Sequence, residues 1–199
     1  VQWFINQQKD EGTKPSDIEA GYNFFVKQSA KVFALYEVHC QTNDLVDFAG
    51  LLVKSYELLK NNTSLLEHYQ RQFKHILVDE FQDTNTVQYQ WIKLLKTNSN
   101  HTFCVGDDDQ SIYGWRGAKI ENIQKIERDF QPIKVIKLEQ NYRSSRNIIE
   151  AASCVISKNE MRKGKKMWTS NPVGDSLQVI ECLNDKKEAE FIADEINSL

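Results

Sequence analysis

Two short apolar runs, each ending abruptly at acidic residues, constrain the fold more than any other feature of the sequence. The first is Ile76-Leu77-Val78, followed by Asp79-Glu80, and the second is Thr102-Phe103-Cys104-Val105, followed by Gly106-Asp107. Continuous apolar runs of this length are typical of buried parallel strands. The segment 87–96 between them has its apolar residues at helical spacing. The sequence therefore predicts a strand, a helix and a second strand within an α/β fold with a parallel sheet.

The rest of the chain is predicted to be mainly helical. Apolar residues recur at helical spacing in segments 21–35, 45–59, 65–73, 120–130 and 148–156, and again from residue 187 onward. Two more strands are expected, at residues 134–138 and 177–183. The expected helix caps are Ser64, Thr84 or Thr86, and Ser144 or Ser145.

Composition excludes several classes of protein. The 199 residues carry a formal net charge of -3, so there is no global positive field and any contact with nucleic acid must be local. The four cysteines and four histidines show no metal-ligand spacing, which favours a reduced, cytoplasmic protein without a metal cluster. No apolar stretch approaches the roughly 20 residues of a membrane span. Because the chain begins at Val1 within an apparent element, we expect it to be part of a longer protein.

The acidic residues after the two strands form the first candidate site. In open α/β sheets, ligands bind beyond the carboxyl ends of the strands, where Asp79, Glu80 and Asp107 would emerge. One carboxylate there can hold Mg2+, while its neighbour orients or deprotonates a water molecule that attacks a γ-phosphate. The alternative is that Asp-Glu begins a solvated loop and that Asp83 caps a helix.

The loop after the second strand, residues 105–118, combines acids, aromatics and glycines. Asp107-Asp108-Asp109 should repel one another unless a cation or backbone donors lie nearby. Tyr113, Trp115 and Arg116 follow among glycines that allow close approach to a ligand, and bases of single-stranded DNA stack on such aromatic faces. The alternative is that Tyr113 and Trp115 are core residues, although polar, glycine-rich surroundings are poor material for a core.

A third candidate lies in Leu138-Glu139-Gln140-Asn141-Tyr142-Arg143-Ser144-Ser145. The guanidinium of Arg143 is permanently charged and suits phosphate oxygens, so it can stabilise the charge that develops during phosphoryl transfer. The alternative is an ordinary helix start with an exposed arginine. The basic run 162–166 can contact phosphates, but a solvated charged loop is the preferred interpretation.

Three strings in order along the chain resemble motifs II, III and IV of the superfamily 1 DNA helicases of the UvrD/PcrA/Rep type. They are Ile-Leu-Val-Asp-Glu-Phe-Gln-Asp-Thr-Asn at 76–85, the loop 105–118, and Leu-Glu-Gln-Asn-Tyr-Arg-Ser-Ser at 138–145. The resemblance spans nearly the whole chain and is closest to the UvrD branch. It implies two RecA-like motor domains of the P-loop NTPase type with ATP between them. Residues 1–73 would then belong to helical accessory domain 1B, 74–138 to the second half of motor domain 1A, and 139–199 to the start of motor domain 2A.

The resemblance also implies residue roles. Asp79 would be the Mg2+ ligand, Glu80 the general base, and Gln110 the sensor of the γ-phosphate. Tyr142 would stack on adenine and Arg143 would be the arginine finger. The residues that meet DNA would be Tyr113, Trp115 and Arg116.

The implied activity is that of an ATP-dependent helicase that moves 3′ to 5′ on single-stranded DNA and unwinds duplexes in repair or replication. Its partners would be single strands, junctions of single and double strands, and repair proteins. The phosphate loop G-x-x-x-x-G-K-S/T does not occur in the sequence, so these 199 residues alone are expected not to hydrolyse ATP. The alternatives are a helicase subunit of a RecB/AddA-like helicase-nuclease or defence system, and a non-catalytic DNA-binding module.

Overall fold

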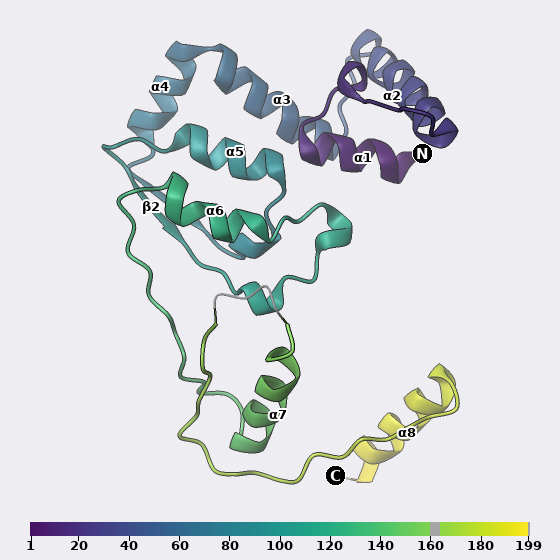
Figure 1. Cartoon of the computed structure of the whole chain (residues 1–199), viewed down its shortest axis with the longest axis vertical. Helices are drawn as coiled ribbons and strands as arrows, with labels where there is room; N and C mark the ends of the chain where they lie inside the picture. Colours follow the sequence, from purple (N-terminus) through teal and green to yellow (C-terminus); the bar gives the residue numbers. More distant parts are fainter. Residues whose placement is uncertain (160–163, 199) are drawn as a thin grey trace. The chain divides into compact units, whose positions relative to one another are not determined.

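A computed structural model describes residues 1–159 and 164–198 (Figure 1). The chain forms two compact units, Val1–Val135 and Ile136–Leu199, which are described separately below. Arg162 and Lys163 of the basic run lie outside the described residues. Within the described ranges, no helix has both the length and the apolar character needed to cross a membrane.

The first unit contains the predicted strand, helix and strand. Strand β1 (His75–Val78) pairs in parallel with β2 (His101–Cys104), with Leu77 opposite Phe103 in the register. Helix α5 (Thr86–Leu95) connects them. The predicted mixed α/β arrangement with parallel strands is therefore confirmed for this pair.

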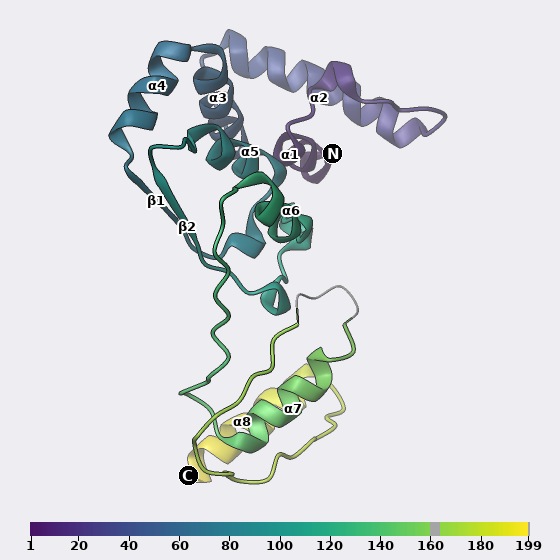
Figure 2. The ribbon, with the colours of Figure 1, turned by 60° about the vertical axis from the view of Figure 1, so that its left-hand side comes forward.

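The two strands are covered on one face. Val78 and Cys104 pack against a buried cluster formed by Phe81 with Tyr89, Ile92 and Phe130, and Figure 2 shows α5 and α6 (Glu121–Asp129) on that side of the strands. Leu77 and Phe103 point to the opposite face, where they are 75% and 62% exposed. The prediction of buried strands is therefore met on one face only, because alternate side chains point to opposite faces and the described residues cover one of them.

The remaining helices of this unit precede the strands. They are α1 (Gln2–Glu11), α2 (Phe24–Thr42), α3 (Phe48–Asn61) and α4 (Thr63–Gln72), with a short 3-10 turn at Pro15–Asp17 between α1 and α2. A further 3-10 turn, Phe81–Asp83, follows β1, and two more, Asp108–Gln110 and Gly114–Arg116, follow β2.

Side-chain caps explain where these helices begin. Asn62 caps α4 by accepting a hydrogen bond from the Leu65 N–H, so the prediction of Ser64 as the cap is wrong. Asn85 caps α5 in a reciprocal capping box with Gln88, which also corrects the prediction of Thr84 or Thr86. Asparagine binds the free N–H groups of a first turn at least as well as serine or threonine.

A buried ion network joins three of the early helices. Lys9 of α1 is 6% exposed, and its ammonium lies 2.6 Å from a Glu37 carboxylate oxygen of α2 and 2.8 Å from Asp47 Oδ2. Asp47 also caps α3 through the Gly50 N–H and accepts a hydrogen bond from the Tyr36 hydroxyl. Burial alone would raise the pKa of Asp47, but these hydrogen bonds outweigh it and hold the pKa below its usual value.

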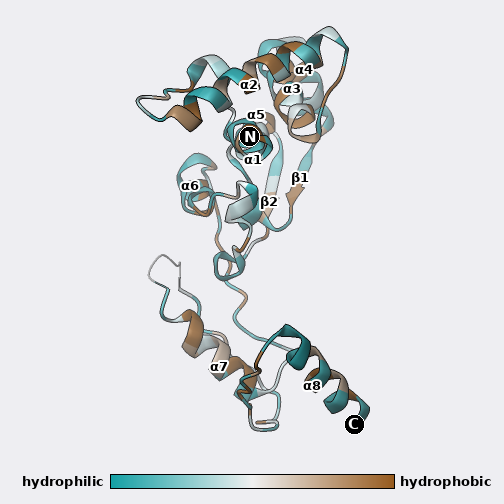
Figure 3. Ribbon diagram, turned by 90° about the vertical axis from the view of Figure 1, so that its right-hand side faces the viewer, coloured by the Kyte–Doolittle hydropathy of each residue, from teal (hydrophilic) through white to brown (hydrophobic). Residues whose placement is uncertain are grey.

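The second unit contains helices α7 (Arg146–Ile156) and α8 (Asp185–Ser198). Ser145 occupies the capping position of α7, as predicted, but its side chain makes no capping hydrogen bond. Figure 3 shows the hydrophobic stretches of α7, whose Ile149 is buried.

The prediction of strands at 134–138 and 177–183 is wrong. Both segments lie within the described residues and are irregular. A strand needs a hydrogen-bonded neighbour, and the described residues around them provide one parallel bridge, between Gln140 and Trp168.

Candidate nucleotide and DNA site

The acid pair lies at the carboxyl end of β1, as the sequence predicted. Both Asp79 and Glu80 are exposed, and Asp79 Oδ1 accepts a hydrogen bond of 2.9 Å from the Glu80 N–H. Glu80 has a left-handed backbone, with φ 48° and ψ 45°. Such a conformation costs a residue other than glycine about 1–3 kcal/mol, and strained residues of this kind are enriched at functional sites. The alternative in which Asp83 caps a helix is wrong, because Asn85 caps α5.

Gln82 connects this acid pair to the loop after β2. Its side-chain amide is 1% exposed, donates a 2.7 Å hydrogen bond to Glu80 Oε2 and accepts a 3.0 Å hydrogen bond from the Asp107 N–H. The Phe81 N–H also donates to the Val105 carbonyl, at 2.9 Å. The two loops are therefore joined through backbone and side chain. Sequence reasoning missed Gln82, although a glutamine inside an acidic turn is a possible signal of such a bridge.

Gly106 makes room for the Gln82 amide. A Cβ atom at this position would lie 2.9 Å from Gln82 Oε1 and 3.3 Å from the Gln82 backbone nitrogen. Contacts under 3.0 Å between a Cβ and another heavy atom are essentially never found in proteins. Glycine therefore lets the two loops approach this closely, and any other residue would force the Gln82 amide to shift.

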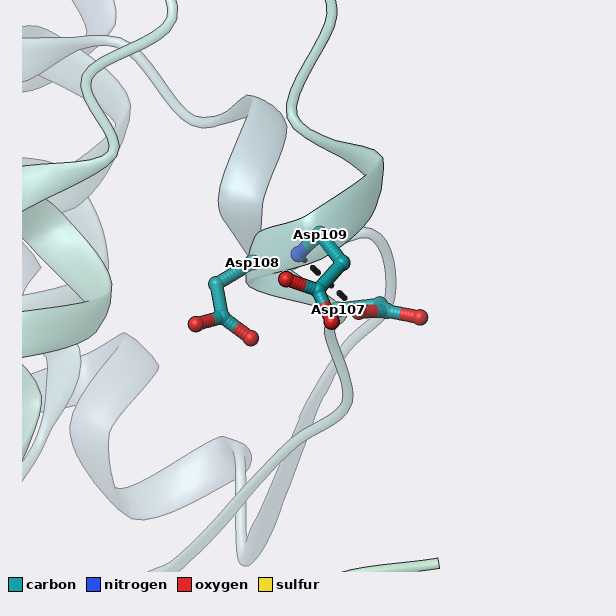
Figure 4. A group of neighbouring side chains, drawn as sticks. All are labelled: Asp107, Asp108 and Asp109. Carbon is teal, nitrogen blue, oxygen red and sulfur yellow. Dashed lines mark hydrogen bonds between the residues drawn. The ribbon is translucent and has the colours of Figure 1, made fainter. Parts of the chain in front are cut away.

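The first of the three adjacent aspartates accepts hydrogen bonds from two nearby donors. Asp107 Oδ1 accepts a 3.1 Å hydrogen bond from the Asp109 N–H, drawn in Figure 4, and Asp107 Oδ2 accepts a 2.6 Å bond from the Gln110 side chain. One carboxylate oxygen from each of Asp107, Asp108 and Asp109 lies within 4.8 Å of the others. Of the two explanations that the sequence offered, a cation or backbone donors, the structure shows one backbone donor, the Asp109 N–H, at Asp107. The predicted γ-phosphate sensor Gln110 contacts the same carboxylate.

Tyr113, Trp115 and Arg116 form an exposed platform. Trp115 is 64% exposed and Tyr113 is 36% exposed. Their ring centroids are 6.3 Å apart, and the Arg116 guanidinium lies 4.5 Å from the Trp115 ring and 5.0 Å from the Tyr113 ring. The alternative in which these aromatics belong to the core is therefore wrong.

The platform loop is fixed to the segment that follows the acid pair. The Lys119 N–H donates to the Thr84 carbonyl at 3.0 Å, and the buried Asn122 amide donates to the same carbonyl at 3.0 Å. Asn85 in turn donates a 2.8 Å hydrogen bond to Asp10 of α1. The left-handed Gly117, with φ +84°, packs directly against that Asp10 side chain. These anchors define the position of the loop relative to β1 and α1.

The third candidate lies in the second unit. Asn141 Oδ1 accepts hydrogen bonds from the Arg143 N–H at 3.0 Å and the Ser144 N–H at 2.8 Å, which forms a tight turn ahead of α7. Tyr142 is 76% exposed and donates a hydrogen bond to the Gln140 side chain, and Arg143 is exposed as well. The turn presents both side chains for contact, and it also fits the alternative of an exposed arginine at a helix start.

Two family models match nearly the whole chain. Residues 1–131 match the UvrD/REP helicase N-terminal domain, and residues 136–199 match the UvrD-like helicase C-terminal domain. The chain belongs to the UvrD/REP helicase family. The second matched region begins at residue 136, where the second compact unit of the structure also begins.

Relatives in this helicase family are similar along the entire chain. This chain is 48% identical over 194 residues to DNA helicase II of Haemophilus influenzae, and it is 46% identical over 196 residues to DNA helicase II of Escherichia coli. Each of these two alignments covers 98% of this chain. The chain is 43% identical over 193 residues to the ATP-dependent DNA helicase PcrA of Staphylococcus epidermidis, covering 96% of this chain. The chain spans 26%, 27% and 26% of the length of these relatives, respectively. The family resemblance predicted from the three motifs is confirmed.

Proposed function

We propose that this chain is the part of an ATP-dependent DNA helicase that positions the metal ion, the attacking water and single-stranded DNA. The observation that carries the proposal is the hydrogen-bonded connection between the acid pair after β1 and the loop that exposes an aromatic platform. One end of this connection has the chemistry of phosphoryl transfer, and the other has the chemistry of base stacking. The names of the relatives, DNA helicase II and ATP-dependent DNA helicase PcrA, support the same activity.

The acid pair suits Mg-ATP. Mg2+ in such sites is bound through one or two carboxylates, with phosphate oxygens and water completing its shell, and Asp79 offers an exposed carboxylate where β1 ends. The ion would neutralise charge on the phosphate oxygens. Glu80 accepts the proton of the attacking water, and Gln110, beside Asp107, contacts the γ-phosphate.

The platform suits single-stranded DNA. Bases stack on Tyr113 and Trp115 without sequence preference, and Arg116 adds a positive charge in a chain whose net charge is -3. The proposed substrate is a single strand or its junction with a duplex. Movement from 3′ to 5′, duplex unwinding in repair or replication, contacts with repair proteins and a cytoplasmic location complete the proposal.

The second unit carries two further residues for which we propose a role with the nucleotide. Tyr142 is proposed to stack on adenine and Arg143 to stabilise the transferring phosphoryl group, and both are exposed. The domain assignment follows the same proposal. Residues 1–73 belong to accessory domain 1B, 74–138 to a RecA-like motor domain 1A, and 139–199 to motor domain 2A.

The proposal is tested on the complete protein that carries this chain. ATP hydrolysis is measured with and without single-stranded DNA for the wild type, for Glu80→Gln, and for Glu67→Gln as an exposed control on α4. Loss of a general base is expected to reduce hydrolysis by about 10²- to 10⁴-fold, with the affinity for ATP retained. Wild-type hydrolysis that does not respond to DNA, or full activity of Glu80→Gln, would overturn the proposal.

A separate measurement addresses the chain alone. Without a phosphate loop, the 199 residues are expected to show no DNA-stimulated ATP turnover. Measurable turnover by the purified chain, abolished by Glu80→Gln, would contradict this expectation.

A further inference from the structure

The Gln82 side chain is buried in a site where both ends of its amide have partners on different loops. Its oxygen accepts the Asp107 N–H at 3.0 Å, and its nitrogen donates to Glu80 Oε2 at 2.7 Å, with a longer contact of 3.4 Å to Asp83 Oδ2. The residue is 1% exposed. Because a buried amide of this kind has lost its contacts with water, these hydrogen bonds determine its orientation.

The orientation of this amide is unambiguous. A flipped amide would direct its NH2 group at the Asp107 N–H, donor against donor, and its oxygen at the Glu80 carboxylate. Gly106 leaves the space that this arrangement needs, since a Cβ there would lie 2.9 Å from Gln82 Oε1. Gln82 therefore has one arrangement in which all of its polar atoms are satisfied.

The partner of this amide is an exposed carboxylate on a strained turn. Glu80 has a left-handed backbone and an otherwise solvent-facing side chain. A long exposed side chain samples several rotamers, and a hydrogen bond from a rigid buried donor selects among them. A general base must lie within hydrogen-bond reach of the proton that it removes, so its orientation affects the rate.

We propose that Gln82 is a positioning residue that holds the Glu80 carboxylate in its working orientation and makes that orientation depend on the Gly106–Asp107 backbone. The inference rests on the proposed role of Glu80 as the base. The loop 105–118, which carries the platform, includes the Gly106–Asp107 backbone. A shift of Asp107 would therefore move the Gln82 oxygen and, through the Gln82 amide, the Glu80 carboxylate. Gln82 acts through Glu80 and is not itself expected to touch the nucleotide.

Four variants of the complete protein separate the two hydrogen bonds. Gln82→Glu keeps the length and an acceptor for the Asp107 N–H, but it loses the donor to Glu80 and places a second carboxylate beside it. Gln82→Met keeps the volume and loses both bonds. Gly106→Ala displaces the amide from the loop side. The matched control is Gln90→Glu, the same chemical change at an exposed position of α5.

The expected result is a fall in kcat without a change in substrate binding. Misplacement of a catalytic group by about 1 Å costs roughly 10²-fold, so hydrolysis with saturating DNA should fall about 10- to 100-fold in Gln82→Glu and Gln82→Met. KM for ATP and the affinity for a fluorescent ATP analogue should stay unchanged, and Gln90→Glu should match the wild type. Unchanged kcat in Gln82→Glu would overturn the inference.

A double-variant cycle distinguishes positioning from a structural role. If Gln82 acts through Glu80, adding Gln82→Met to Glu80→Gln should cause no further loss in single-turnover hydrolysis of radiolabelled ATP. A further loss of the same factor as in the wild-type background would contradict the inference. Thermal melting checks the fold of each variant. If Gln82→Met is unfolded, Gln82→Asn, which keeps the amide but is one methylene shorter, takes its place in the cycle.

The two proposals fail in different ways. If the wild type shows no DNA-stimulated hydrolysis, or if Glu80→Gln is fully active, the proposed function is wrong. If Glu80→Gln is inactive while the Gln82 variants retain the wild-type kcat, the proposed function stands and the positioning role of Gln82 is wrong.

Discussion

Replacing Lys9 with methionine is expected to destabilise the first unit by about 2 kcal/mol. The ammonium forms ion pairs of 2.6 Å with Glu37 and 2.8 Å with Asp47, and it lies over the Tyr36 ring at 4.9 Å from the centroid. Removing one partner of a fully buried pair costs about 3–5 kcal/mol. The Glu37 and Asp47 side chains are 36% and 25% exposed, so water recovers part of that cost. Methionine also retains the apolar packing of the lysine stem.

Urea unfolding of the chain, followed by circular dichroism, measures this change. A loss of about 2 kcal/mol is a roughly 30-fold change in the ratio of folded to unfolded protein. The control is Lys14→Met, since Lys14 is 64% exposed and pairs with Glu57 at 2.9 Å. Exposed pairs contribute about 0–1 kcal/mol. A Lys9→Met variant no less stable than Lys14→Met would refute the reasoning.

The effect of Lys9 is also expected to depend on pH. The pKa of Asp47 lies below its usual value, because hydrogen bonds from Lys9, Tyr36 and Gly50 outweigh the opposing effect of burial. A depressed carboxyl pKa contributes stability that is present above the unfolded value of about 3.9 and is lost as pH falls through the folded value. The difference between the wild type and Lys9→Met should therefore shrink as the solution is acidified below about pH 4.

Three further predictions concern single side chains. Trp115→Ala should weaken binding of labelled single-stranded DNA by the complete protein by about 1–3 kcal/mol, with an unchanged melting temperature because Trp115 is 64% exposed; wild-type affinity would exclude a stacking role. Burial and a hydrogen bond to Asp129 raise the pKa of Tyr89. The free energy of unfolding should therefore fall as pH rises above about 10, and it should fall less steeply in Tyr89→Phe. An equal dependence of the unfolding free energy on pH in the two proteins would contradict the raised pKa of Tyr89. Burial raises the pKa of the Cys104 thiol to about 11. Iodoacetamide at about pH 8.5 should therefore alkylate Cys104 on the order of 100-fold more slowly than the exposed Cys154, as measured by peptide mass spectrometry. Equal alkylation rates would be inconsistent with the burial of Cys104.

Much of the first unit could be predicted from local sequence. The apolar runs at 76–78 and 102–105 predict β1 and β2, because short continuous apolar runs bounded by acidic residues are typical of buried parallel strands. The expected strands at 134–138 and 177–183 are wrong because an apolar segment becomes a strand only beside a partner, which local sequence does not reveal. The caps differ by one or two residues because asparagine, serine and threonine compete for the same position, as Asn62 and Ser64 illustrate.

The types and positions of the candidate site residues could be predicted from the sequence, but the hydrogen bonds that join the two loops could not. Asp79, Glu80 and the exposed platform follow from residue types and from their places after the strands. Gln82 could not be found in this way, because its burial depends on a close approach of the Gly106 backbone from 24 residues further along the chain. The roles assigned to the site residues all stay predictions, since each depends on a ligand; they are Asp79, Glu80, Gln110, Tyr113, Trp115, Arg116, Tyr142 and Arg143.

The uncovered side of the β1–β2 pair has a practical consequence for anyone who produces this chain. In the part of the chain that the structure describes, Leu77 and Phe103 lie opposite each other in the register and are largely exposed, and β1 and β2 pair only with each other. Apolar strands with free edges readily add strands from neighbouring molecules. The yield of monomer from expression will therefore fall as concentration rises, and a solubility screen should begin with detergents and fusion partners that shield this face.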